Sequence, residues 1–257
     1  MKKIAVLFIA HFINEDSIAK FLKLNDELSD ICDVFWAYHK ENEDDKALPD
    51  NICFYIFDMG SIKELQYEPL YDECIHCNVN YILQRFFKDY STYERYWSIE
   101  YDVIFTGNWL LLINSFIDSD ADLISCHIEK YSKEKNGCWD WWKPFIWVDK
   151  EIPLEKCVKA FNPIFSLSNK ALIFMDEYLK KGNSAHFETL MSTALYNNNF
   201  KLVDMGGSGE FTPNMLKNKF YIQGSGTNNG TMRFRPVYLK EEIEALEIKN
   251  KLFHPLK

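Results

Sequence analysis

The stretch YWSIEYDVIF, residues 96–105, is an apolar, strand-like run that two carboxylates, Glu100 and Asp102, interrupt. A buried carboxylate is costly unless it is paired, hydrogen-bonded or bound to a metal ion. Side chains alternate along a strand, so both acids are expected on one face, with their Cα atoms roughly 6–7 Å apart. At that separation both can reach one divalent ion, which prefers oxygen ligands. The stretch therefore predicts a ligand site at the end of a buried strand. The alternative is a pair of exposed acids on an edge strand or in a turn.

The residues before this stretch alternate between strand and helix patterns. Residues 3–9 (KIAVLFI), 32–37 (CDVFWA) and 52–57 (ICFYIF) are apolar runs typical of strands that are covered on both faces. Residues 17–28 and 78–90 carry apolar side chains at helical spacing. This order predicts an α/β fold, in which a mostly parallel sheet is flanked by helices. In such sheets ligands bind at the carboxyl ends of the strands.

The residues after the stretch continue the same pattern, and the length of 257 residues fits a single domain. Residues 139–147 (WDWWKPFIW) are too irregular to assign. Strands are predicted at 121–126 and 200–204, a short strand or turn at 160–167, and helices at 110–117, 168–180, 184–196 and 240–251.

Composition and charge narrow the classes of partner. Apolar residues make up 47% of the chain, which excludes a disordered protein. The formal net charge is −9 and no run of Lys or Arg exceeds a pair, which argues against nucleic acid as a partner. The same balance argues against electrostatic docking on an anionic membrane, although weak peripheral association stays open.

Cysteine usage and the first residues predict a location in the cytoplasm. The seven cysteines are odd in number and scattered, as expected of free thiols in a reducing compartment. The apolar run at 4–10 is short for a signal peptide and is better explained as a first strand. No run approaches the roughly 18 apolar residues of a transmembrane segment.

Residues 97–103 (WSIEYDV), followed by TGNW at 106–109, resemble the acidic-motif region of bacterial polysaccharide glycosyltransferases with the GT-A fold. The resemblance covers roughly residues 3–205 and is most specific within 96–109. It implies one Rossmann-like domain with a nucleotide-sugar-binding half (1–109), an acceptor half (110–205), and C-terminal loops with a closing helix (206–257).

The resemblance also implies that Glu100 and Asp102 hold Mn²⁺ or Mg²⁺ against the donor diphosphate. The sequence departs from the family's Asp-x-Asp-type pattern at Glu100, where the family has Asp. Family members often supply a metal-binding histidine further downstream. Only His254 follows His186, and its place near the terminus argues against a full metal site.

A catalytic base is implied at the start of the helix predicted for 184–196. Inverting GT-A enzymes usually place an acid there, beneath the acceptor, and Glu188 matches that position. Such a carboxylate takes the proton of the attacking hydroxyl. His186 is expected to hold acceptor or metal, and Ser184 to cap the helix. The alternative for Glu188 is an acid that the helix dipole favours in a first turn.

Indole side chains are candidate sugar platforms, because their faces cover apolar C–H patches. Trp109 follows the acidic pair by a short loop, and a helix start after a turn is its alternative explanation. Trp139, Trp141 and Trp142 lie close together beside Asp140, which would be awkward to bury. These tryptophans are expected to bind the acceptor, with an ordinary core corner as the alternative.

Candidate donor-binding groups lie on loops. His11 follows the first predicted strand, where the GT-A resemblance puts the nucleotide. Arg233 and Arg235 are able to pair with a diphosphate, and the glycine-rich loop 206–209 offers backbone N–H groups for phosphates. Surface loops without a ligand are the alternative for all of them.

These observations predict a glycosyltransferase that moves a sugar from a nucleotide-sugar donor, UDP-linked, to a glycan hydroxyl in bacterial surface polysaccharide synthesis. A sugar nucleotidyltransferase is the first alternative, but such enzymes usually carry a glycine-rich basic loop after the first strand, and residues 10–20 hold no Gly and no Arg. The second alternative is a carbohydrate-binding relative that has lost its chemistry.

Overall fold

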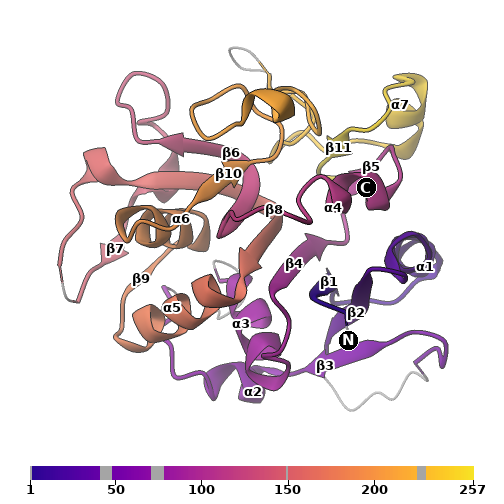
Figure 1. Ribbon diagram of the computed structural model, residues 1–257, viewed down its shortest axis with the longest axis horizontal. Helices are drawn as coiled ribbons and strands as arrows, with labels where there is room; N and C mark the ends of the chain where they lie inside the picture. Colours follow the sequence, from indigo (N-terminus) through magenta and orange to yellow (C-terminus); the bar gives the residue numbers. More distant parts are fainter. Residues whose placement is uncertain (1, 41–47, 71–77, 149, 225–229) are drawn as a thin grey trace.

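The computed structural model describes residues 2–40, 48–70, 78–148, 150–224 and 230–257. Its centre is a seven-stranded sheet with the order β10-β6-β8-β4-β1-β2-β3 (Figure 1). All neighbouring strands are parallel except β8, which runs antiparallel to both β4 and β6. The predicted fold class, an α/β protein with a mostly parallel sheet flanked by helices, is confirmed.

The first half of the sheet follows the apolar runs of the sequence. Strand β1 (Ile4–Ala10) lies between β2 (Cys32–His39) and β4 (Arg95–Glu100), and β2 also pairs with β3 (Phe54–Phe57). Six of the seven residues of β1 are buried, as expected of a central parallel strand.

The second half contains β6 (Leu123–Lys130), β8 (Val158–Ser168) and β10 (Leu202–Asp204). The sequence predicted only a short strand or turn at 160–167, whereas β8 has 11 residues and joins the two halves of the sheet. Its register against β6 shifts between Ile124 and Cys126. Such an irregularity breaks the period-two alternation by which a strand is recognised.

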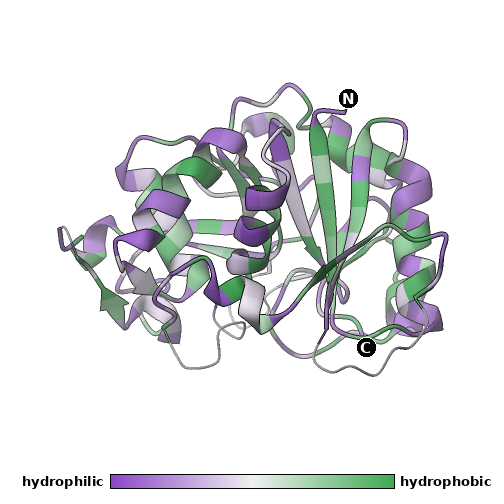
Figure 2. Ribbon diagram, turned by 90° about the horizontal axis from the view of Figure 1, so that it is seen from below, coloured by the Kyte–Doolittle hydropathy of each residue, from purple (hydrophilic) through white to green (hydrophobic). Residues whose placement is uncertain are grey.

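Helices cover both faces of the sheet (Figure 2). One face packs against α3, α5 and α6, and the other against α1, α4 and residues 216–221. The helices are α1 (Glu15–Leu28), α2 (Met59–Lys63), α3 (Asn80–Asp89), α4 (Trp109–Asn114), α5 (Asn169–Lys180), α6 (Phe187–Asn197) and α7 (Lys240–Ala245), with 3₁₀ turns at Asp140–Trp142, Leu154–Lys156 and Asn214–Leu216. None of the helices in the described part of the chain combines the length and apolar character needed to cross a bilayer.

Three predicted elements differ from the structure near the site. The single strand predicted for 96–105 is broken by a turn into β4 and β5 (Ile104–Phe105). The helix predicted for 184–196 begins with a short strand, β9 (Ser184–Ala185), which pairs with β7 (Phe145–Ile146), so His186 rather than Ser184 is the cap of α6.

The closing helix predicted for 240–251 is also wrong in its second half. Helix α7 ends at Ala245, and both Glu247 and Asn250 have positive φ, which a helix does not tolerate. The chain then forms β11 (Leu252–Phe253), which pairs antiparallel with β5 (Figure 1). This pairing carries the last residues back to the acidic turn.

Candidate functional site

The site is built around the turn that ends β4. Glu100 is the last residue of the strand, and Asp102 lies in the turn, where the Val103 N–H donates to the Glu100 carbonyl at 3.0 Å. The Tyr101 N–H donates to the Ile9 carbonyl of β1 at 3.0 Å, which ties the turn to the carboxyl end of the central strand. A turn, and not alternation along one strand, therefore brings the two acids together.

His254 completes this group, contrary to the expectation that its position in the chain argues against a full metal site. The β5–β11 pairing sets Phe253 opposite Ile104, and the Leu256 N–H donates to the Asp102 carbonyl at 2.9 Å. His254 Nε2 consequently lies 3.5 Å from Asp102 Oδ2. One ligand atom from each of Glu100, Asp102 and His254 lies within 4.8 Å of the other two.

The hydrogen bond on the other ring nitrogen orients His254. Its Nδ1 lies 2.8 Å from the Arg233 carbonyl oxygen. A carbonyl can only accept a hydrogen bond, so Nδ1 must carry the hydrogen and act as the donor. Nε2 is thus turned toward the acids. A histidine whose Nδ1–H is fixed by a backbone carbonyl is a common metal-ligand arrangement.

The electrostatics of the three groups are compatible with a bound cation. Burial, and then the neighbouring Asp102 charge, raise the pKa of Glu100 to about 8. Burial opposes protonation of His254, but the hydrogen bond and charge of Asp102 outweigh it and raise the pKa of the imidazole. Asp102 Oδ1 is buried and has no hydrogen-bond partner among the described residues. Two carboxylates, one of which has an oxygen without a hydrogen-bond partner, and an imidazole are suitable ligands for a divalent ion such as Mn²⁺ or Mg²⁺.

A cavity of about 380 Å³ opens beside Glu100, at the carboxyl ends of β1 and β2. Its lining includes His11, Tyr101, His39 and Phe57. The His11 and Tyr101 rings meet edge to face at 5.8 Å, and the His39 ring stacks on Phe57 at 5.2 Å. The predicted donor residue His11 thus lies in the wall of a largely apolar hollow that suits a flat ring.

Glu188 lies in the first turn of α6. The His186 Nδ1 accepts the Glu188 N–H at 3.4 Å, and Glu188 Oε1 accepts the Asn162 N–H at 2.9 Å. Burial raises the pKa of Glu188 to about 7, against the opposing effects of Asn162 and Lys159. The charge of Glu188 also contributes to the raised pKa of Glu100.

Two of the four predicted tryptophan platforms lie beside Glu188. Trp141 stacks on the His186 ring at 4.4 Å with an interplanar angle of 15°, and Trp139 meets the same ring edge-on at 6.3 Å. The Lys159 ammonium sits 5.1 Å from the centre of the Trp139 ring. Aromatic faces and a titratable carboxylate thus gather at the start of α6.

The other two tryptophans are core residues in this structure. Trp142 is 3% exposed, and its indole N–H donates to the Asn136 carbonyl at 2.7 Å. Trp109 is 5% exposed and packs on Phe105, with ring centres 5.4 Å apart. Because both indoles are covered by the protein, neither offers a face to an acceptor, and the prediction for these two residues is corrected.

Residues that were predicted to bind the donor phosphates make contacts within the protein. The Arg233 Nε–H donates to the Pro236 carbonyl at 2.8 Å, and its guanidinium lies 3.8 Å from the centre of the Tyr238 ring. The Nε–H and one face of the guanidinium are therefore engaged within the protein, and donor binding by Arg233 stays a prediction.

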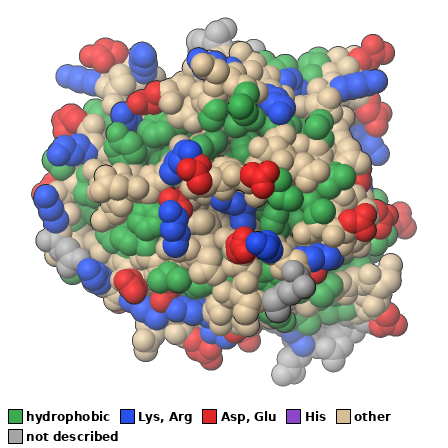
Figure 3. Space-filling view, viewed as in Figure 1, with side chains coloured by type: hydrophobic (Ala, Val, Ile, Leu, Met, Phe, Trp, Pro, Cys, Tyr) green, Lys and Arg blue, Asp and Glu red, His purple; other side chains and the backbone are tan. Residues whose placement is uncertain are grey.

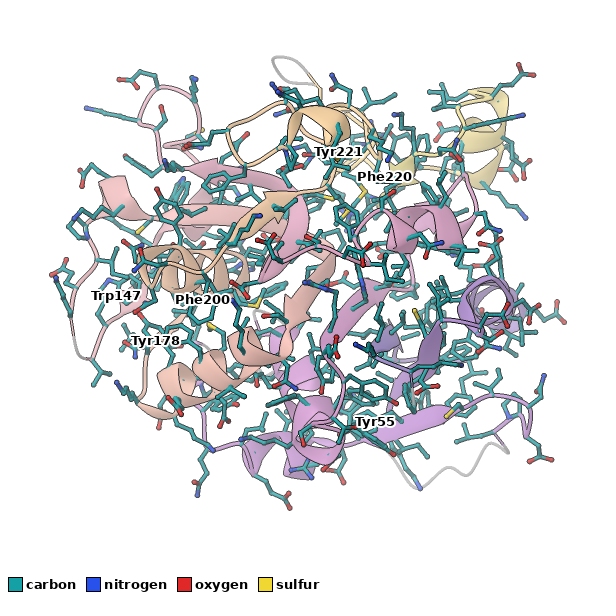
Figure 4. All side chains as sticks on the ribbon, in the orientation of Figure 1. Tyr55, Trp147, Tyr178, Phe200, Phe220 and Tyr221 are labelled. Carbon is teal, nitrogen blue, oxygen red and sulfur yellow. The ribbon has the colours of Figure 1, made fainter. Side chains whose placement is uncertain are left out.

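In the glycine-rich loop 206–209, the N–H groups of Gly206 and Gly207 donate to Asp204 Oδ1, at 2.9 and 2.7 Å. The Tyr221 hydroxyl holds the same carboxylate from the loops above β10 (Figure 4). These two amides are engaged within the protein, so they are not available to a phosphate as the prediction for this loop requires.

Sequence reasoning missed the roles of Tyr101, His39 and Lys159, and it discounted His254. Tyr101 lies inside the quoted stretch 97–103, where attention went to the two acids on either side of it. His39 and Lys159 belong to no local motif, because they reach the site only when strands far apart in the chain become neighbours. A lone histidine or lysine carries no spacing signal that marks it beforehand.

Comparisons with known proteins give similarities of fold only. No protein-family model matches the chain, and no curated protein matches it. Among solved structures, a glycosyltransferase involved in the glycosylation of the major capsid of PBCV-1 is 14% identical with a TM-score of 0.35. That match covers 68% of this chain, which spans 63% of the other.

Two further solved structures are similar at 12% identity. One is a putative glucose-1-phosphate thymidylyltransferase from Bacillus anthracis in complex with a sucrose, with a TM-score of 0.45 over 81% of this chain and 88% of that one. The other is 4-diphosphocytidyl-2C-methyl-D-erythritol synthase from Anaerococcus prevotii, with a TM-score of 0.40 over 82% and 91%. A function for this chain has to come from its side-chain geometry.

Proposed function

We propose that this protein is a metal-dependent glycosyltransferase that moves a sugar from a nucleoside-diphosphate donor, UDP-linked, to a glycan hydroxyl. The observation that carries the proposal is the meeting of Glu100, Asp102 and His254 within 4.8 Å, beside the 380 Å³ cavity. Glu100 belongs both to the group of three ligands and to the lining of the cavity, so a ligand bound in the cavity would reach the acids.

The cavity would receive the nucleoside. Its lining by His39, Phe57 and His11 offers apolar faces for a flat base, while the acids at its mouth face the phosphates. Two carboxylates alone would repel a diphosphate, so the proposal requires a cation held by Glu100, Asp102 and His254. Bound there, a divalent ion would act as a Lewis acid on the diphosphate oxygens.

The chain's own residues account for the proton that the reaction must move. The acceptor hydroxyl gives its proton to the Glu188 carboxylate while its oxygen forms a bond to the anomeric carbon. The bond from that carbon to the diphosphate oxygen breaks, and the diphosphate leaves with the electron pair. A carboxylate with a pKa near 7 suits a general base at neutral pH.

The acceptor side would be formed by Trp139 and Trp141 beside Glu188. Their stacking around His186 gives a rigid aromatic wall on which a sugar ring can lie. The resemblance of residues 97–109 to bacterial polysaccharide enzymes supports a surface glycan as the acceptor. With one base beside the acceptor, we expect a single displacement at the anomeric carbon, which inverts its configuration.

Calorimetric titration with UDP in the presence of Mn²⁺ tests the proposal directly. Wild-type protein is expected to bind UDP and to hydrolyse or transfer the sugar of a UDP-sugar slowly. Asp102→Asn should abolish both, with little change in melting temperature, because Asp102 repels Glu100 as well as attracting His254. Asp118→Asn, the same change at an exposed site, is the matched control.

Two results would contradict the proposal. The first is the absence of heat and of thermal protection across UDP, GDP, CDP and ADP with Mn²⁺ or Mg²⁺. The second is release of pyrophosphate from a nucleoside triphosphate and a sugar 1-phosphate, which would indicate nucleotidyl transfer instead.

A further inference from the structure

One face of strands β6 and β8 connects the ion ligands with the aromatic wall at the start of α6. At the beginning of β8, buried and half-buried residues alternate, and the half-buried ones are Lys159 and Phe161, so these two side chains point to the same face of the sheet. The Phe161 ring meets the His254 ring edge to face at 5.2 Å. The Lys159 ammonium lies 5.1 Å from the centre of the Trp139 ring. This face therefore extends from the ion ligands to the acceptor side of the proposed reaction.

Lys159 forms an ion pair on this face with a residue that has no part in the mechanism described above. Glu129 stands opposite Lys159 in the antiparallel pairing of β6 with β8, and Glu129 Oε2 lies 3.4 Å from Lys159 Nζ. The Lys159 side chain is 18% exposed and the Glu129 side chain 34%, so the pair is not sealed from solvent.

The protein holds this pair in place and leaves part of its hydrogen-bonding capacity unused. Glu129 Oε2 accepts a hydrogen bond from Asn136 Nδ2 at 3.1 Å, while Oε1 accepts none from any residue that the structure describes. The ammonium has three N–H donors, and within the described residues Glu129 supplies its one oxygen partner. A ligand can therefore add hydrogen bonds without displacing an existing contact.

The chemistry of the pair matches the hydroxyls of a neutral sugar. A carboxylate only accepts hydrogen bonds and an ammonium only donates them, whereas a hydroxyl does both. One hydroxyl can thus donate to Glu129 while its neighbour on the sugar ring accepts from Lys159, and hydrogen bonds to charged groups are stronger than neutral ones. An acidic sugar would instead bring a negative charge against Glu129, and the nearby cation is already paired.

We infer that Glu129 and Lys159 bind two adjacent hydroxyls of the acceptor, and that the acceptor sugar is uncharged. This inference rests on the proposed function and names the chemical class of its acceptor. Both residues act on the binding and orientation of the sugar, and Glu188 remains the group that takes the proton.

The binding of simple glycosides tests the inference. Wild-type protein loaded with UDP and Mn²⁺ is titrated with methyl β-glucoside, methyl β-galactoside, methyl α-mannoside and methyl β-glucuronide, and saturation-transfer NMR follows the bound sugar. The same titrations are made with Glu129→Gln, Lys159→Gln and the conservative variant Lys159→Arg. Calorimetry measures the UDP affinity of each protein separately.

Lys130 and Glu210 provide a matched control pair. Their side chains form an ion pair at 2.7 Å, and the Lys130 ammonium lies 5.2 Å from the centre of the Tyr196 ring. Lys130 follows Glu129 in β6, so its side chain points to the other face of the sheet. Lys130→Gln and Glu210→Gln should therefore bind the glycosides as wild type does.

At least one neutral glycoside is expected to bind wild-type protein. Glu129→Gln and Lys159→Gln should each weaken that binding by about 10- to 100-fold, a usual size for the loss of a hydrogen bond to a charged group. Lys159→Arg keeps the charge and the donors, so it should recover part of the affinity. UDP affinity should stay the same in all of these variants, because the pair lies on the acceptor side.

Three results would overturn the inference. If the neutral glycosides bind Glu129→Gln and Lys159→Gln as tightly as wild type, the pair does not bind the acceptor. If methyl β-glucuronide alone binds, the acceptor is acidic. If UDP binds and no glycoside does, this face is not an acceptor site, while the donor part of the proposed function stands. A wild-type protein that binds neither UDP nor any glycoside would refute the proposed function together with the inference.

Discussion

Glu188 is a carboxylate whose charged form the fold disfavours, and this has opposite consequences for stability and for catalysis. Its pKa of about 7 lies above the ordinary value of 4.5, so the native state holds the proton more tightly than the unfolded chain. The stabilisation is complete at low pH and is lost as the pH rises from about 4.5 through 7. In the proposed mechanism the catalytic form is the ionised one, so the base would become active as its stabilising proton leaves.

Replacing Glu188 with Gln is expected to abolish transfer and to stabilise the protein at pH 8. The amide still accepts the Asn162 N–H but has no proton to lose, so its free energy of unfolding should exceed that of wild type by of order 1–3 kcal/mol at pH 8. At pH 4 the two proteins should be equally stable. Urea unfolding at both pH values measures this, and a variant less stable than wild type at pH 8 would contradict it.

His254 is expected to contribute affinity for the ion and little to the hydrophobic core. His254→Ala removes one of three ligands and leaves the Arg233 carbonyl without its donor, so Mn²⁺ binding should weaken by at least about tenfold. Paramagnetic resonance of free Mn²⁺ in a titration measures the change. His127→Ala, at a histidine outside the group of three ligands, is the control and should keep wild-type affinity. Equal Mn²⁺ affinity in His254→Ala and wild type would show that the imidazole is not a ligand of the ion.

At the scale of elements, local sequence patterns predict a helix or strand correctly where the residues of that segment themselves determine its structure. The apolar patterns predicted β1, β2 and α1 within a few residues, and the helix predicted for 168–180 is α5, which the Ser168 hydroxyl caps by accepting the Ala171 N–H. The wrong predictions concern segments whose secondary structure depends on pairing with a distant strand. The break after Glu100, the strand β9 and the strand β11 all exist because of pairing with distant residues.

The same distinction explains how much of the site could be predicted. Glu100 and Asp102 were recognisable because acids are costly within an apolar run, and this argument needs no tertiary information. His254 was discounted because its proximity depends on β11 pairing with β5. Trp142 and Trp109 were assigned to the acceptor because composition does not tell a buried indole from an exposed one.

The small β5–β11 sheet is expected to carry both stability and ion binding. Phe253 is fully buried against Tyr238, Leu256 and Ile243, so Phe253→Ala should cost about 3–5 kcal/mol. Mn²⁺ affinity should fall as well, since the neighbouring His254 loses its support. Leu246→Ala, at an exposed site nearby, should change stability by less than about 0.5 kcal/mol. Urea denaturation and Mn²⁺ titration of both variants test the coupling. A destabilised Phe253→Ala protein with unchanged affinity would contradict it.

At the scale of the whole molecule, the site collects residues from both halves of one sheet. The 380 Å³ cavity lies at β1 and β2, the two acids lie at the end of β4 and in the turn after it, and Glu188 approaches from α6, which packs on β8. On the face shown in Figure 3, positive and negative side chains are interspersed and form no large field of one sign. This face therefore provides no extended positive field for the anionic donor of the proposed function.

Ligand binding is expected to stabilise the entire fold, because the site joins segments that are distant in the chain. At 100 times its dissociation constant, UDP with Mn²⁺ should add about 2.7 kcal/mol to the free energy of unfolding. For a chain of this size that corresponds to a rise of roughly 5–10 °C in melting temperature. Differential scanning calorimetry measures it, and Asp102→Asn should show no rise. A shift of the same size in that variant would mean that the ligand binds elsewhere.

The delivery of His254 by β11 has a consequence for the order in which a newly made chain becomes competent. During synthesis the two acids leave the ribosome well before His254 does, and the early parallel strands β1, β2 and β4 are complete by then. The strands that line the 380 Å³ cavity thus precede the imidazole in the order of synthesis. Under the proposed function, the ion site is complete only once β11 has paired with β5.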